Sequence, residues 1–168
     1  MRGKYTRFLI LSSCFATLSF SAGIVSADAL SAAQRKLEEV IETCYPGVDA
    51  ESLAVPEISI GGVFSTLSIG LNGRTTAYVI NPQYLLCGGK TAGLCGTRGC
   101  DISIFAGEHR FLYTGWQPEN LIYGENNLIL LIQSGWACGM QINASRCFSI
   151  LAWDDIVNNF VYNHGNPK

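Results

Sequence analysis

Cys87-Gly-Gly-Lys-Thr-Ala-Gly-Leu-Cys95-Gly-Thr-Arg-Gly-Cys100 is the stretch that decides how this chain folds. It places three cysteines and five glycines within 14 residues and offers few apolar side chains to a core. Runs rich in β-branched residues lie on both sides of it, at Thr75 to Ile80 and at Asp101 to Phe105. Because burial cannot order a loop of this composition, covalent bonds or coordination must hold it.

The first 27 residues have the pattern of a secretory signal peptide. Basic residues at Arg2, Lys4 and Arg7 precede an apolar run, and small residues end the segment at Ala27. The apolar run is shorter than the roughly 20 residues that cross a bilayer, so we expect cleavage after Ala27 instead of a membrane anchor. An alternative starts from Cys14, which ends a segment resembling a lipobox and would then be a lipidated N-terminus.

Composition predicts one exported domain after this segment. Removing residues 1–27 takes away three of the 11 basic residues and none of the 13 acidic ones, so the net charge falls to about −5. Nothing basic is clustered, which argues against nucleic-acid binding, and no later segment is apolar over a membrane-spanning length. We expect a single domain at 28–162, a flexible tail at 163–168, and a soluble periplasmic or secreted product.

Six cysteines remain after the signal segment, an even number that indicates disulfides in an exported protein. They are Cys44, Cys87, Cys95, Cys100, Cys138 and Cys147. Gly-Thr-Arg-Gly separates Cys95 from Cys100 and can turn the chain back on itself. Another turn-rich segment separates Cys138 from Cys147. Exclusion then pairs Cys44 with Cys87.

Periodicity predicts an α+β fold. Residues 31–43 read as an amphipathic helix capped by Ser31, with Cys44 at the end of its apolar stripe. Short β-rich runs separated by turn residues follow. The expected strands are Val63 to Ile69, Thr75 to Ile80, Asp101 to Phe105, Arg110 to Thr114, Asn127 to Gln133, Phe148 to Trp153 and Ile156 to Tyr162. This spacing leaves no room for crossover helices, so we expect a mainly antiparallel meander with the N-terminal helix packed on it.

The cysteine motifs resemble those of a family of small exported proteins of α-proteobacterial type. Members share a Cys-Gly-Thr-x-Gly-Cys hairpin with a preceding cysteine, then Gly-x-x-Cys-Gly, another cysteine and Trp-Asp. These motifs are Cys87, Cys95 to Cys100, Gly135 to Gly139, Cys147 and Trp153-Asp154. The likeness covers roughly Leu71 to Asp155; it implies the architecture and brings no established activity. Arg74 stands where other members carry an aspartate-rich turn, which argues against calcium binding there.

Catalytic and metal-binding interpretations fit the sequence less well. Cys95 and Cys100 have four residues between them, whereas dithiol oxidoreductases have two, and a strand follows instead of a helix. Zinc held by Cys95, Cys100, Cys138 and Cys147 would lack the usual spacing in its second pair. His109 lies beside a turn residue, and the adjacent Asp154 and Asp155 favour a bend. We therefore predict no catalytic residues, no metal and no cofactor.

Binding is the function that the sequence favours. Trp116 and Trp136 fall in turn-rich segments, and Arg98 lies at the tip of the cysteine-closed turn. Aromatic and arginine side chains on rigid loops are typical of contact surfaces. The expected partner is another extracytoplasmic protein or a cell-wall glycan. Two alternatives remain: an inhibitor or immunity protein against a cell-wall-active enzyme or toxin, and a thiol-redox or metal-dependent enzyme.

Overall fold

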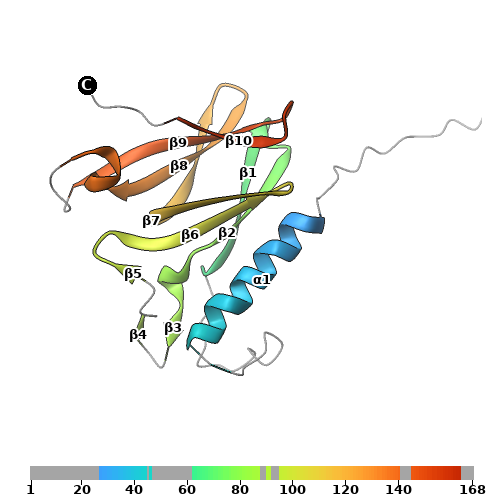
Figure 1. The fold of residues 1–168 in the computed structure, drawn as a ribbon. Helices are drawn as coiled ribbons and strands as arrows, with labels where there is room; N and C mark the ends of the chain where they lie inside the picture. Colours follow the sequence, from blue (N-terminus) through green and yellow to red (C-terminus); the bar gives the residue numbers. More distant parts are fainter. Residues whose placement is uncertain are drawn as a thin grey trace, which may run out of the picture.

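The structure, a computed structural model, describes residues 27–44, 46, 62–87, 90–91, 95–140 and 145–163 (Figure 1). The predicted signal peptide and Cys14 lie outside the described residues, except for Ala27. Most of the predicted tail does too, since only its first residue, Asn163, is described. The described part contains one α-helix and an antiparallel sheet, which confirms the α+β class.

The elements follow one another with short connections. They are α1 (Ala27–Cys44), β1 (Phe64–Leu71), β2 (Thr75–Ile80), η2 (Pro82–Tyr84), β3 (Leu86–Cys87), β4 (Lys90–Thr91), β5 (Cys95–Gly96), β6 (Gly99–Ala106), β7 (His109–Tyr123), β8 (Asn126–Ser134), η3 (Gly135–Cys138), β9 (Arg146–Asp154) and β10 (Asn159–Asn163). Here η marks a short 3₁₀ helix. No described helix is long and apolar enough to cross a bilayer.

Helix α1 begins four residues earlier than predicted, so the assignment of Ser31 as its N-cap is wrong. Ala29 and Ala33 are buried and extend the apolar stripe of Val40 and Ile41 by about three turns towards the N-terminus. This stripe packs on the face that β2 and β6 turn towards the helix. The longer contact surface explains why the helix extends beyond the sequence-predicted cap.

The sheet is a curled meander. Its strands run in the order β1-β2-β6-β7-β8-β9-β10, all neighbours are antiparallel, and β5 joins the side of β6. The end of β1 also pairs with the start of β8, through Gly70 with Asn127 and Leu71 with Asn126. That pairing brings the two halves of the sheet together, so that β8 and β9 meet β1 (Figure 1). The meander was predicted, but the β1–β8 contact was not.

Two apolar clusters result from this shape. One lies between α1 and the outer side of β2 and β6, and includes Ile41, Ile80 and Phe105. The other lies inside the curl, where Trp153 packs among buried residues of β2, β6, β8 and β9. Trp153 is only 6% exposed, so it belongs to the core. The second cluster holds the strands that carry the candidate site in fixed register.

Two strand boundaries differ from the prediction by more than two residues. Strand β7 runs well past the expected end at Thr114, because a register shift between Trp116 and Glu119 lets it bend without ending. The last strand starts at Asn159, not at Ile156. Asp154 Oδ1 accepts hydrogen bonds from the backbone N–H groups of Ile156 and Val157, at 2.8 and 3.2 Å, and so closes a turn there.

Candidate functional site

Two disulfides lie at the same end of the sheet, called the bridged end below. Cys100 pairs across β6 and β7 with Gly115, which pairs with Gln133 on β8, which in turn pairs with Cys147 on β9. Cys100 and Cys147 therefore stand at the two ends of one row of paired residues, and each forms a disulfide, with Cys95 and with Cys138. In these two disulfides the Cα atoms are 4.2 and 6.2 Å apart.

The third disulfide has a different place. Cys44, the last residue of α1, is bonded to Cys87 in β3, with Cα atoms 5.2 Å apart. All three bonds thus join the cysteines that spacing and exclusion paired, so none of the six is a free thiol in this structure. The zinc alternative needed four of these thiols. Among the described residues no group of three or more His, Cys, Asp or Glu side chains could hold a metal ion.

Glycines allow the strands to approach closely at the bridged end. Gly99 has a φ of +105°, and a Cβ atom there would overlap the backbone oxygen of Gly115. A Cβ atom at Gly115 would in turn overlap the backbone oxygen of Ile132. Any side chain at either position would push the strands apart. The two glycines therefore hold β6, β7 and β8 close together beside the disulfides.

Arg98, inside one disulfide-closed turn, contacts Trp136, which lies just before the other disulfide-closed segment. Arg98 occupies the turn between β5 and β6, and its guanidinium carbon lies 5.5 Å from the centre of the Trp136 ring. Trp136 belongs to η3, two residues before Cys138, and is 54% exposed. A guanidinium over an indole face is attractive by about 0.5–1 kcal/mol at an exposed site. The sequence placed both residues in turns but did not show that they meet.

Trp116 also lies against an arginine, Arg146. Arg146, the first residue of β9, places its guanidinium carbon 5.0 Å from the Trp116 ring centre. Trp116 lies in β7 and not in a turn, so that expectation was wrong, and its side chain is half-buried under Arg146. We call Arg98, Trp116, Trp136 and Arg146 the Arg–Trp surface. Among the described residues, the ion pair that is found joins Lys36 to Glu39 on α1. Within that part of the chain, Arg98 and Arg146 therefore have no carboxylate partner.

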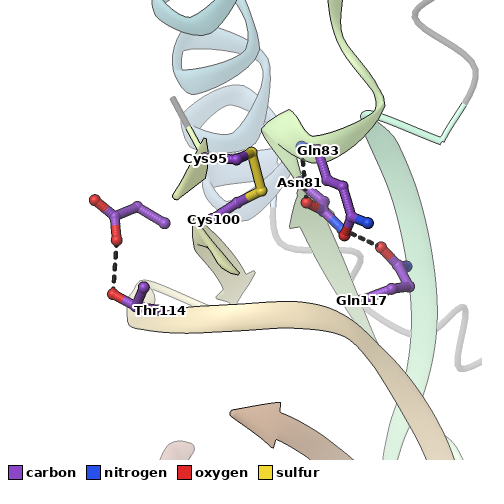
Figure 2. The surroundings of a disulfide bond; sticks show 7 residues. Asn81, Gln83, Cys95, Cys100, Thr114 and Gln117 are labelled. Atoms are coloured by element: carbon purple, nitrogen blue, oxygen red, sulfur yellow. Dashed lines mark hydrogen bonds between the residues drawn. A yellow bond between two sulfur atoms is a disulfide. The ribbon is translucent and has the colours of Figure 1, made fainter. Parts of the chain in front are cut away.

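A polar network supports the bridged end from the helix side. The Asn81 amide, fully buried, donates to Gln117 Oε1 at 2.6 Å and accepts from the backbone N–H of Gln83 at 3.0 Å (Figure 2). Thr114 donates to Asp101 at 2.7 Å, next to Cys100. These bonds tie β7 to β6 and to η2. They keep the surface rigid, which lowers the entropy lost when it binds a partner.

His109, Asp154 and Asp155, the other polar residues considered from the sequence, make contacts that stabilise turns or pack against the core. The ring of His109 lies 6.3 Å from that of Trp153, at the β6–β7 turn. Asp155 accepts from the backbone N–H of Leu71 at 2.7 Å and from Thr75 Oγ1 at 3.3 Å, joining the β9–β10 turn to β1 and β2. Asp154 closes its own turn. The two adjacent carboxylates thus serve separate turns and do not act as a pair.

The pKa values of Tyr113 and Glu39 are shifted by their surroundings. Burial raises the pKa of Tyr113, whose hydroxyl donates to the backbone oxygen of Trp116 at 2.6 Å. A hydrogen bond from Lys36 lowers the pKa of Glu39 on the exposed side of α1. Tyr113 is therefore neutral at physiological pH, and its hydroxyl holds the backbone next to the Arg–Trp surface in place.

Sequence reasoning missed Arg146. Its signal was available, since residues alternate from Arg146 to Asp154 and so place Arg146 on one face with Phe148 and Ile150. Comparison of the chain with protein-family models, with curated proteins and with solved structures found no significant match. Function is therefore inferred from the residues themselves.

Proposed function

We propose that this chain is an exported, non-catalytic binding protein that contacts its partner through the Arg–Trp surface. Three disulfides support export, because such bonds persist in oxidising compartments and are rare in a reducing cytoplasm. The basic, apolar and small-residue pattern of residues 1–27 adds to this, and so does the resemblance to small exported proteins. The compartment we propose is the periplasm or the medium.

One observation carries the proposal. Arg98, inside the loop that Cys95–Cys100 closes, lies over Trp136, which precedes the bonded Cys138 by two residues in η3. Both side chains are exposed, yet the turn of Arg98 is closed by a disulfide and the short helix of Trp136 ends at a bonded cysteine, so little freedom is lost on association. Tryptophan and arginine are the residues most often found at the energetic centre of protein interfaces.

We infer that the partner is another extracytoplasmic protein. A glycan would stack its sugar rings on free indole faces, but a guanidinium already lies over one face of both Trp116 and Trp136. The arginines keep N–H groups available for carboxylates of a protein. Binding to a cell-wall glycan is the competing outcome, and the experiment below includes it.

The test is affinity capture from a periplasmic extract, compared with sedimentation of the chain with purified cell-wall sacculi. We expect one protein to be retained by the wild type and by Arg74→Ala, an exposed arginine of the β1–β2 turn. The same protein should be retained at least about tenfold less by Arg98→Ala and by Trp136→Ala. Equal retention by all four chains contradicts the proposal. Sedimentation with sacculi that Trp136→Ala abolishes would show that the partner is a glycan.

An inhibitor or immunity protein is the second candidate. It is favoured by the exposed Gly96, Thr97 and Arg98 between the bonded Cys95 and Cys100, since a covalently closed loop suits insertion into an enzyme. Adding the chain to the captured enzyme would then abolish that enzyme's activity at equimolar concentration, and Arg98→Ala would not. A thiol-redox or metal-dependent enzyme requires free cysteines, so thiol labelling of the purified chain without reductant tests that alternative directly.

A further inference from the structure

The outer face of β9 carries a self-complementary order of side chains. Residues of this strand alternate between the buried core and the outside. The outward set is Arg146, Phe148, Ile150, Ala152 and Asp154. Phe148 is 60% exposed and Ile150 is 40% exposed, although both are large and apolar. The face thus begins with a cation, ends with an anion and is apolar between them.

Neighbouring strands extend the apolar part. On β8, Ile132 pairs with Phe148 and Leu130 pairs with Ile150. On β10, Val161 pairs with Ala152 and is 48% exposed. Helix α1 covers β2 and β6 instead, on another part of the sheet (Figure 1). Among the described residues nothing covers this face, which we call the β9 face.

We propose that the β9 face binds the same face of a second copy of this chain. Arg146 and Asp154 lie four residues on either side of Ile150, so a two-fold axis through Ile150 places the Arg146 of each copy against the Asp154 of the other. The two Ile150 side chains meet at the axis, and Phe148 lies against the Ala152 of the second copy. Charge complementarity is reciprocal, as a two-fold dimer requires.

The distances are compatible with two stacked sheets. Aligned sheets pack about 10 Å apart with their strands crossing at about 30°. Four residues from the axis, about 13 Å along the strand, this angle moves the two ends apart by about 7 Å, which an arginine side chain can span. Arg146 is already held over Trp116, so its guanidinium is oriented before the second copy binds. Asp154 uses Oδ1 to close its turn, and Oδ2 is the oxygen that would accept from Arg146.

The area predicts a dimer that dissociates on dilution. Strand β9 has nine residues, which gives a face about 30 Å long at about 3.4 Å per residue. Three to four strands about 4.8 Å apart make it roughly 17 Å wide, or about 500 Å² per copy. Two copies would bury about 1,000 Å², below the roughly 1,200–2,000 Å² of stable specific interfaces and within the range of weak, transient ones.

The test is sedimentation velocity of the purified chain at low and high micromolar concentration. We expect a monomer–dimer equilibrium for the wild type. Ile150→Lys places two like charges at the axis and should raise the dissociation constant at least about a hundredfold. Val157→Lys adds the same charge to an exposed turn residue outside the face and should leave the dissociation constant unchanged. Circular dichroism and the thermal midpoint confirm that both variants fold.

A second measurement does not depend on destabilising the dimer. Under mild oxidation, Ile150→Cys should form a covalent dimer through a disulfide between the introduced thiols of the two copies. Ile156→Cys, whose thiol is at least as accessible but lies far from the axis, should not. A wild type that is monomeric throughout overturns the proposal, and so does a dimer that Ile150→Lys leaves intact. Arg98→Ala should not change the dissociation constant, because Arg98 lies outside the β9 face, whereas Arg146 belongs to both the β9 face and the Arg–Trp surface.

Discussion

Removal of the Cys44–Cys87 disulfide tests how the helix is held to the sheet. The double variant Cys44→Ala/Cys87→Ala opens a loop with a sequence separation of 43 residues. The chain-entropy model gives about 4 kcal/mol for a loop of that length, against about 2.7 and 2.2 kcal/mol for Cys138–Cys147 and Cys95–Cys100, whose separations are 9 and 5. These are upper values, because the unfolded chain is more compact than the model assumes. The first loss is comparable to the whole stability of a marginal domain.

The assay is chemical denaturation of the wild type and of the three double variants, each lacking one bond. We expect the free energy of unfolding to fall most for the Cys44–Cys87 pair. Hydrogen exchange should also become faster within residues 27–44 before it does so in β6 to β8, because α1 then depends on its apolar stripe alone. A larger loss from removing Cys95–Cys100 would refute the reasoning, as would unchanged exchange in α1.

Two further predictions concern the far end of the sheet and the core. Asp155→Ala removes the acceptor of the Leu71 N–H and of Thr75 Oγ1, so it should lower the free energy of unfolding by about 1–3 kcal/mol. Glu108→Ala, the control at an exposed turn residue, should change that free energy by less than about 0.5 kcal/mol. Equal losses for the two variants in chemical denaturation would contradict this prediction. Burial raises the pKa of Tyr113 in the folded chain, so above about pH 10 this tyrosine ionises in the unfolded chain first. The free energy of unfolding should therefore fall above about pH 10, by at most about 1.4 kcal/mol per pH unit. Tyr113→Phe should flatten that decline in unfolding measured from pH 8 to 11, and an unchanged slope would show that burial of Tyr113 is not its cause.

Local patterns carried much of the fold. Turn sequences between Cys95 and Cys100, and between Cys138 and Cys147, bring each pair together without help from distant residues. Short runs of β-branched and aromatic residues between turn residues identified the strands. Boundaries failed where a tertiary contact decides them. The extra turn at the start of α1 depends on burial of Ala29 and Ala33 against the sheet, and β7 continues past Thr114 because β8 is there to pair with it.

By itself the sequence determined the α+β class and the three cysteine pairs, and it placed Arg98 in a closed turn. Each follows from neighbours in the chain or, for Cys44 with Cys87, from elimination. Only the tertiary structure decided that β1 pairs with β8, that Arg98 lies over Trp136 and that Arg146 lies over Trp116. These contacts join residues about 30 to 60 positions apart, so strand register, set by packing inside the curl, is what brings them together.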